Sequence, residues 1–173
     1  MIRRRKDVAW QRLLASDDMG YLQQRIDPGG WYPMETFERF GIAILSELEE
    51  VTLDAVQTWG HFSAAQYAAE HPDLVAACDP VDSMMRLKVM RSTLFNFPAF
   101  DIPMLIESEA HVVITYHMSP KAEEAACRQT MGFCEGILSL SGATDIRAAF
   151  VERSWAGDAK TLLSLEWKSP ARR

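Results

Sequence analysis

Hydrophobic residues follow two different periods along this chain. In the first half they recur at helical spacing, as in Phe37, Phe40, Ile44 and Leu48, which would share one face of a helix. In the second half they alternate with polar residues over 111–118, a period of two that is typical of strands. The change of period predicts helices first and a sheet later.

Capping signals set the expected helices of the first half. A short amphipathic helix is predicted over 5–16, and the segment "DPGGWYP" then breaks the chain. Pro33 opens a second helix, and Asp79 with Pro80 opens another by supplying an N-cap and a proline at the first helical position. Between these come a helix from Asp54 to Glu70, ended by His71-Pro72, and one further helical turn within 73–79.

The second half predicts strands around one long helix. The two prolines of "NFPAFDIP", residues 96–103, indicate an irregular segment, and two short strands follow, joined around 107–110. A helix over 119–141 starts with Ser119 and Pro120 and stops before Gly142. Strands over 144–153 and 160–167, joined through Gly157-Asp158, complete a β-β-α-β-β unit. The fold class is therefore α+β, with an antiparallel sheet and a helix packed on it.

The length of 173 residues fits a single domain. Within it we expect an N-terminal helix and break (1–30), a helical part (31–95) and a sheet-plus-helix part (100–168).

Two interior glycines of the 119–141 helix require an explanation, because each costs about 1 kcal/mol relative to alanine. Gly132 and Gly136 lie on one side of the helix and would let it approach another backbone closely. Close packing within the chain is one interpretation. A contact with a second subunit, through Gly132, Phe133 and Gly136, is the other.

Composition limits the classes of partner. The net charge of −6 argues against nucleic acid, and no apolar run approaches the roughly 20 residues of a membrane span. The basic start "MIRRRKDVAW" has no apolar stretch behind it, so we expect no secretory signal, and the three cysteines are odd in number without a CxxC pair. We therefore expect a cytoplasmic protein with reduced thiols and no membrane insertion.

No catalytic or metal-binding motif is present. HExxH, GxSxG, GxGxxG and Walker patterns are all absent from the sequence. His111 and His117 would be about 20 Å apart along one strand, too far to share a metal ion. Cys134 with His117 as nucleophile and base is disfavoured, since a cysteine in the middle of a buried helix is inert. We expect no enzymatic activity, no metal site and no cofactor.

Methionines and aromatic residues offer one candidate ligand site. Nine methionines occur, and they either fill the core or line a deformable apolar cavity between the helices and the sheet. Phe95, Phe97 and Phe100 would line its mouth or plug it, and we expect the plugged, packed version. The candidate ligand-binding residues are Met84, Met85, Phe97, Phe100, Tyr116 and Met131.

The second half also resembles a known superfamily. The stretch "VITYHM…GFCEGILSLSGATDIRAAFVERSWAGDAKTLLSLEW" and the earlier "WYPMETFERFGIAI" are similar to the heme-NO-binding-like group. This group includes H-NOX gas sensors, four-vinyl-reductase-like (V4R-like) bacterial sensor domains and Bet-type TRAPP subunits. The chain looks closest to an uncharacterised branch of bacterial proteins expanded in myxobacteria. The shared cues are Gly132, Phe133 and Gly136 in the helix, and Gly157-Asp158 in the last turn.

What the resemblance implies depends on where this sequence departs from it. H-NOX sensors hold heme iron through a histidine in the helix before the first hairpin, and here that helix, residues 80–95, has none. Their Tyr-x-Ser-x-Arg propionate motif is replaced by "YHMSPK", and the cysteines of V4R-like domains are missing after Cys134. We therefore expect a non-enzymatic signalling or scaffold module without heme, which binds a protein partner or itself as a homodimer. A sensor of an apolar small molecule is the alternative.

Overall fold

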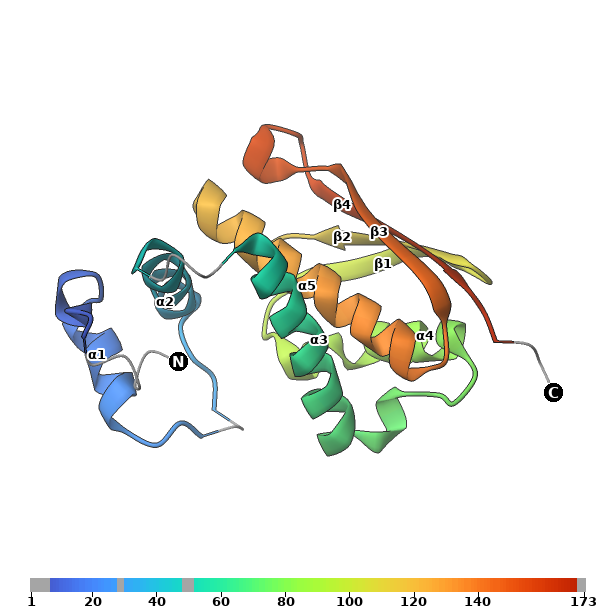
Figure 1. The fold of residues 1–173 in the computed structure, drawn as a ribbon, viewed down its shortest axis with the longest axis horizontal. Helices are drawn as coiled ribbons and strands as arrows, with labels where there is room; N and C mark the ends of the chain where they lie inside the picture. Colours follow the sequence, from blue (N-terminus) through green and yellow to red (C-terminus); the bar gives the residue numbers. More distant parts are fainter. Residues whose placement is uncertain (1–6, 28–29, 48–51, 171–173) are drawn as a thin grey trace. The chain divides into compact units, whose positions relative to one another are not determined.

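The computed structural model describes residues 7–27, 30–47 and 52–170. Its contacts divide the chain into two compact units, Met1–Thr52 and Leu53–Arg173 (Figure 1). Within the described residues, no helix has both the length and the apolar character needed to cross a membrane.

The first unit is a small helical assembly. It contains a 3₁₀ turn η2 (Trp10–Arg12), helix α1 (Ser16–Gln23) and helix α2 (Met34–Glu47). Trp10, Leu14 and Ala43 form its buried core. Pro33 precedes α2 as predicted, and its carbonyl oxygen accepts a hydrogen bond from the Thr36 amide at 3.1 Å.

An ion pair between the buried Asp18 and the partly exposed Arg39 ties α1 to α2 in this unit. Asp18 is fully buried, and its carboxylate accepts hydrogen bonds from Arg39 Nε at 2.5 Å and Arg39 Nη2 at 2.8 Å. The same carboxylate accepts the Ala15 amide at 2.9 Å, which caps the start of α1. The hydrogen bonds from Arg39 lower the pKa of Asp18 to about 2 despite its burial. The carboxylate is therefore charged throughout the physiological range.

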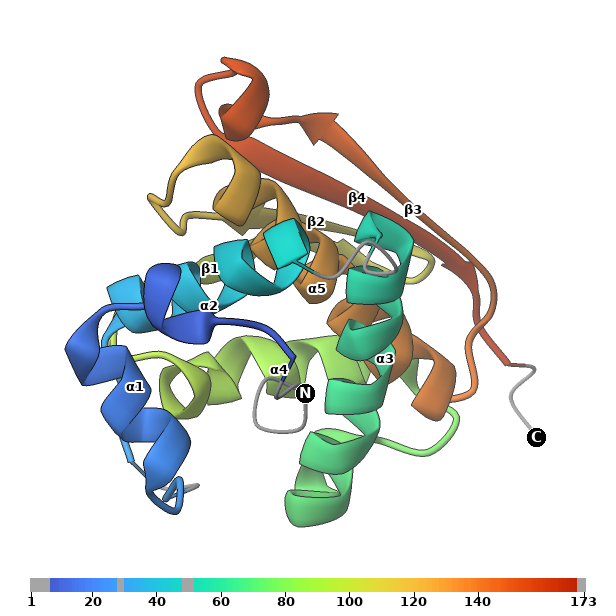
Figure 2. The same cartoon turned by 60° about the vertical axis from the view of Figure 1, so that its left-hand side comes forward.

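The second unit places its helices over one sheet. The helical elements are α3 (Leu53–Glu70), the 3₁₀ turn η3 (Pro72–Leu74), α4 (Pro80–Leu94) and α5 (Pro120–Leu140). The strands are β1 (Phe100–Ile106), β2 (Glu109–Ile114), β3 (Thr144–Glu152) and β4 (Thr161–Lys168), in the order β1-β2-β4-β3 with every neighbour antiparallel. Helix α5 lies between α3 and the sheet (Figures 1 and 2). The predicted α+β class, with a helix packed on an antiparallel sheet, is confirmed.

The strand pattern explains which face of the sheet carries the core. Alternate residues of β4 are buried, from Thr161 through Leu163 and Leu165 to Trp167. Val112 and Ile114 of β2 are buried beside them, whereas His111 and Val113 are only half-buried. Each strand thus turns one side toward the helices, as its alternating sequence predicts.

Glycines set the distance between α3 and α5. A Cβ at Gly132 would overlap the carbonyl oxygen of Gln57, and a Cβ at Gly60 would overlap that of Gln129. A Cβ at Gly136 would come within 2.7 Å of the Ala64 Cβ. The glycines therefore allow the two helix backbones to touch, which is the within-chain interpretation.

Three segments differ from the predictions. Residues 5–16 were predicted as one helix, but the described part holds η2 and the start of α1 instead. Segment 96–103 is not wholly irregular, because β1 begins at Phe100 and accommodates Pro103 as an edge strand with a register shift between Asp101 and Met104. The alternation over 111–118 does not continue as a strand: β2 ends at Ile114, and His117 has a positive φ of 55°. Leu48, predicted on the apolar face of the second helix, lies outside the described residues.

Candidate interaction site on helix α4

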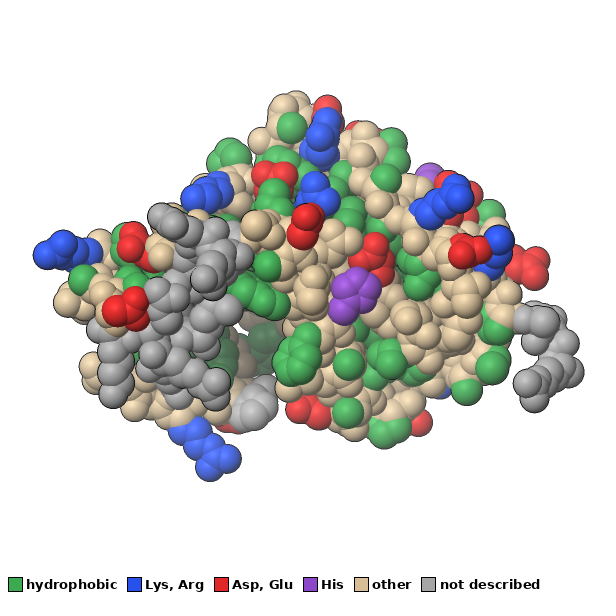
Figure 3. Space-filling model, in the orientation of Figure 1, with side chains coloured by type: hydrophobic (Ala, Val, Ile, Leu, Met, Phe, Trp, Pro, Cys, Tyr) green, Lys and Arg blue, Asp and Glu red, His purple; other side chains and the backbone are tan. Residues whose placement is uncertain are grey.

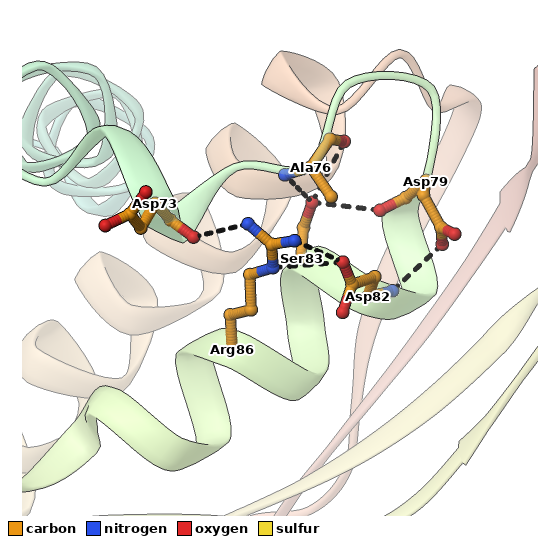
Figure 4. A network of polar contacts seen from close by, with 6 residues as sticks. All are labelled: Asp73, Ala76, Asp79, Asp82, Ser83 and Arg86. Atoms are coloured by element: carbon orange, nitrogen blue, oxygen red, sulfur yellow. Dashed lines mark hydrogen bonds and ion pairs between the residues drawn. The ribbon is translucent and has the colours of Figure 1, made fainter.

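Helix α4 starts from a well-defined cap. The Asp79 carboxylate accepts the Asp82 amide at 2.9 Å, and Pro80 occupies the first helical position, as the sequence predicted. The Ser83 hydroxyl donates to the carbonyl oxygen of Asp79 and accepts the Ala76 amide, both at 2.9 Å (Figure 4). These bonds fix the loop before α4 to the first turn of the helix.

Arg86 extends this network along the helix. Its guanidinium contacts the Asp82 carboxylate through Nε at 3.0 Å and Nη2 at 2.7 Å, one helical turn earlier. Its Nη1 donates to the backbone carbonyl of Asp73 at 2.7 Å, so the carboxylate of Asp73 is not used in this contact (Figure 4). The sequence signal for Asp82 and Arg86 was their i, i+4 spacing, which our sequence analysis did not use. No pattern in the sequence predicts the contact between Arg86 and the backbone carbonyl of Asp73 in η3.

The outer side of α4 forms an open groove of about 390 Å³. Its lining comprises Asp73, Met85, Arg86, Val89 and Met90. The side chain of Val89 is 73% exposed and that of Met85 is 48% exposed, although both are apolar. On the face seen in Figure 3, hydrophobic side chains are scattered among charged ones rather than gathered over one large area. An apolar groove bordered by charged side chains is suited to contact with another molecule.

The predicted ligand residues do not come together as one cavity lining. Met84, Phe100, Tyr116 and Met131 are buried, each with at most 7% of its surface exposed. Phe97 is half-buried and Met85 opens to the α4 groove. The Phe95 ring joins three of them, with centroid distances of 5.6 Å to Phe97, 6.4 Å to Phe100 and 5.8 Å to Tyr116. These aromatic residues contact one another through Phe95, which the sequence placed with Phe97 and Phe100 at the mouth of the expected cavity.

The buried polar groups near this core are unreactive at neutral pH. The Tyr116 hydroxyl shares a hydrogen bond of 2.6 Å with the Thr130 hydroxyl, and burial raises the pKa of Tyr116. Burial also raises the pKa of Cys127 and of Cys134 to about 12, so both thiols stay protonated at neutral pH. A protonated thiol is a poor nucleophile. All three cysteines are free.

A second polar cluster joins α5 to the β3–β4 connection, and the sequence analysis missed it. The Ser154 hydroxyl donates to the Glu123 carboxylate at 2.6 Å and shares a 2.6 Å hydrogen bond with the Thr161 hydroxyl. Glu123 is only 8% exposed and Thr161 is fully buried. The sequence placed Glu123 in the first turn of a helix and gave no sign that Ser154 would reach it.

The four histidines all lie outside α4. His61 contacts the Glu135 carboxylate at 3.0 Å, and His111 contacts that of Glu109 at 3.0 Å. The His71 ring packs 4.2 Å from the Tyr67 ring, and His117 is exposed beyond the end of β2. The described residues include no group of three or more His, Cys, Asp or Glu side chains placed to hold a metal ion.

The candidate interface residues of α5 face inward. Gly132 and Gly136 are buried against α3, and Phe133 is half-buried with its ring 6.1 Å from that of Tyr67. Contact with α3 therefore occupies the surface that a second subunit would need at these two glycines. Homodimer formation itself stays a prediction.

Comparison with solved structures identifies the fold. An H-NOX protein from S. oneidensis, solved in the Fe(II) ligation state, superposes with a TM-score of 0.63 at 15% identity, over 94% of this chain and 85% of that one. A point mutant of T. Tengcongensis H-NOX gives a TM-score of 0.62 at 13% identity, over 99% and 95% of the two chains. An H-NOX protein from S. oneidensis in the Fe(II)NO state gives 0.60 at 14% identity, over 92% and 86%.

The chain has an H-NOX-like fold. No protein-family model matches the sequence, and no curated protein matches it either. At these identities the similarity establishes architecture alone. It bears out the resemblance to the heme-NO-binding-like group at the level of the fold.

The residues of α4 do not fit heme ligation by histidine. Helix α4, Pro80–Leu94, carries two adjacent methionines, of which Met84 is buried and Met85 is exposed. No imidazole lies on this helix. The side chains of α4 therefore provide no imidazole nitrogen for iron.

Proposed function

We propose that this protein is a heme-independent signalling or scaffold module that acts by binding another protein. It is non-enzymatic in this proposal. The observation that carries the proposal is the character of α4, which lacks an imidazole and exposes Met85 and Val89 beside an open groove. H-NOX-like architecture supports a sensor or signalling context by analogy of fold.

The packing of the sheet supports the same proposal. Met84, Phe100 and Met131 are buried in the folded unit, so these residues serve the core in the conformation described. Met85 and Val89 of the α4 groove are among the large apolar side chains that stay exposed. Contiguous exposed apolar side chains mark contact surfaces, and Met85 and Val89 lie one turn apart on the same helix.

A hemin titration of the full chain tests the loss of heme ligation. We expect no stoichiometric Soret band to survive gel filtration, because no histidine of α4 can bind the iron. The S. oneidensis H-NOX protein, treated in parallel, supplies the positive control. Recovery of one heme per chain, with the spectrum of a ligated iron, would contradict the proposal.

The alternative function is a sensor of an apolar small molecule. The observation that favours it is the presence of Met85 and Met90 in one groove, because methionine adapts to varied apolar shapes. Native mass spectrometry of the full chain purified from its own host separates the two functions. A bound apolar compound at one per chain would favour the sensor, and a ligand-free chain would favour the interaction module.

A further inference from the structure

We infer that two copies of this chain pair through the free edge of β3, antiparallel and related by a two-fold axis, so that their sheets join into one continuous sheet. The occupant of the edge is therefore the same strand of a second copy. This inference goes beyond the proposed function, and it does not depend on the α4 groove.

The two edges of the sheet differ in how they are protected. At β1, Pro103 has no backbone N–H to donate, and the Lys88 ammonium of α4 donates to the Ile102 carbonyl oxygen at 2.7 Å. The Asp101 carboxylate of the same strand contacts Lys88 at 3.8 Å and Arg91 at 3.3 Å. Proline and charged side chains are the usual means by which an edge strand is kept from pairing with another chain. The β1 edge is therefore blocked.

Strand β3 lacks such protection in the part of the chain that the structure describes. It spans nine residues, Thr144–Glu152, contains no proline, and has β4 as its one neighbour in the sheet (Figure 2). Outside its ladder with β4, no hydrogen bond reaches its backbone from a described residue. An edge strand of this kind presents a row of unpaired N–H and C=O groups, and such a row binds another extended strand.

The regular part of β3 indicates where the two-fold axis lies. Its ladder with β4 keeps one register from Arg147 to Phe150 and shifts at either end. Pairing centred on Ala149 places this regular stretch at the axis, where a small side chain meets its own copy. Residues directly opposite each other share one face of the sheet, so Arg147 lies opposite Val151 of the second copy. The arginine stem would then cover an apolar side chain that is 60% exposed in one copy.

Charge favours the same register. It brings Asp145 opposite Arg153 of the second copy, twice by symmetry, and both side chains are exposed. Asp145 departs from extended geometry with a φ of 50°, so the long arginine side chain spans the contact. Asp145 also contacts Lys168 of its own chain at 2.6 Å, whereas Arg153 has no ion pair among the described residues.

Neighbouring registers are less favourable. A slide of two residues in one direction places Arg147 opposite Arg153 of the second copy, and like charges directly opposite each other destabilise a strand pair. The same slide in the other direction separates Asp145 from Arg153 and leaves neither directly opposite a charge. An unrelated extended segment would meet the same backbone groups without this symmetric charge pattern, which is why we assign the edge to a second copy.

Sedimentation equilibrium of the full chain, from about 1 to about 200 µM, tests the pairing. We expect a reversible dimer of twice the 19.6 kDa chain mass. Arg153→Glu should raise the dissociation constant at least about tenfold, because it sets acidic side chains against each other at two symmetric places. Combining Asp145→Arg with Arg153→Glu should restore the constant to within about threefold. Glu70→Arg, an exposed charge reversal on α3, is the control and should leave it unchanged.

Disulfide cross-linking reads the register directly. The experiment uses a Cys78→Ser chain, which lacks the exposed native thiol. In it, Ala149→Cys should form an intermolecular disulfide on mild oxidation, because opposite Cα atoms of an antiparallel pair lie about 5 Å apart. Arg147→Cys should not, since the two copies of that position would be roughly 13 Å apart along the strands. Non-reducing electrophoresis measures both.

Three results would overturn the inference: a monomer across the whole concentration range, a double exchange that dimerises no better than Arg153→Glu, or equal cross-linking of the two cysteine variants. Circular dichroism of each variant checks that it is folded, and the cross-linking decides the matter if a charge reversal unfolds the chain. A monomeric chain contradicts the β3 pairing alone, because the hemin titration tests the proposed function separately.

Discussion

The α3–α5 contact and the outer side of α4 differ in the side chains that their helices present. The first is built from glycines, and the second carries large apolar side chains. At the first, Gly60, Gly132 and Gly136 remove side chains so that two backbones meet. At the second, Met85 and Val89 extend large apolar side chains into solvent. Both surfaces belong to the same unit and both come from helices of ordinary length.

The difference separates residues kept for stability from residues free for binding. A glycine in a helix interior costs stability on its own, so the close backbone approach that it permits must offset that cost. An exposed valine or methionine contributes little to folding. The substitutions below should therefore have large effects at the α3–α5 contact and small effects on the outer side of α4.

The largest expected effect is at Gly132. Gly132→Ala forces a Cβ onto the carbonyl oxygen of Gln57, and backbone cannot move aside as a side chain can. We expect a loss of about 3 kcal/mol in the free energy of unfolding, at the upper end of the usual cost of overpacking. Urea unfolding followed by circular dichroism measures it.

Gly41→Ala is the matched control for Gly132→Ala. Gly41 lies within α2 and no atom stands within 4 Å of a Cβ built there. The substitution should stabilise its helix by roughly 0.5–1 kcal/mol, through the unfolded chain. Equal losses at both glycines would show that the α3–α5 contact is not specially tight.

The second largest loss of stability is expected at the ion pair of Asp18 and Arg39 in the first unit. Asp18→Asn removes the charge that holds Arg39, and we expect a loss of about 2 kcal/mol, because the buried side chain loses its charge-assisted hydrogen bonds to Arg39. Hydrogen exchange of the α1 and α2 amides, measured by mass spectrometry, reports this unit by itself.

The Asp18 contribution should also depend on pH. The folded-state pKa of Asp18 lies at about 2, below the unfolded value of about 3.9, so the stabilisation is present above the unfolded value. It is lost as the pH falls toward 2. The difference between the natural chain and Asp18→Asn should therefore be constant from pH 7 to pH 5 and shrink below about pH 4. A difference that grows in acid would contradict this assignment.

The Ser154 hydroxyl should have a moderate effect. Ser154→Ala leaves the buried Glu123 carboxylate without the donor it has at 2.6 Å, and we expect a loss of about 1–2 kcal/mol. Ser139→Ala, an exposed serine near the end of α5, should change stability by less than about 0.5 kcal/mol. Thermal unfolding of the two variants side by side provides the comparison.

The smallest effect is expected on the outer side of α4. Val89→Ser should change the free energy of unfolding by less than about 0.5 kcal/mol, because the side chain is already 73% exposed. Its neighbour Leu87 is fully buried, and Leu87→Ala should cost about 3 kcal/mol. Urea unfolding of both variants measures the two losses. A large loss from Val89→Ser would mean that this side chain belongs to the core.

Local chemistry made much of the fold predictable. Ser119, Pro120 and Gly142 bound the long helix as the structure has it, and Asp79 with Pro80 starts α4. The alternating residues of β4 gave both the strand and its buried side. These capping and alternation signals act within a few residues, so distant parts of the chain do not change what they predict.

Long-range contacts account for what the sequence did not predict. Gly132 indicated a close approach but not its partner, because Gly60 lies some seventy residues earlier in an alanine-rich helix without a distinctive pattern. Pro103 read as a strand breaker, yet an edge strand tolerates it. Met84 and Met85 differ only in which side of α4 they occupy, and that side is decided by how the sheet and α5 pack.

Methionine oxidation footprinting tests the central claim, that α4 turns an open apolar face to solvent. The full chain is exposed briefly to hydrogen peroxide, and the oxidation rate of each methionine is read by peptide mass spectrometry. The account predicts fast oxidation of Met85, which is 48% exposed, and slow oxidation of the adjacent Met84 and of Met131. Protection of Met85 equal to that of Met84 would contradict it.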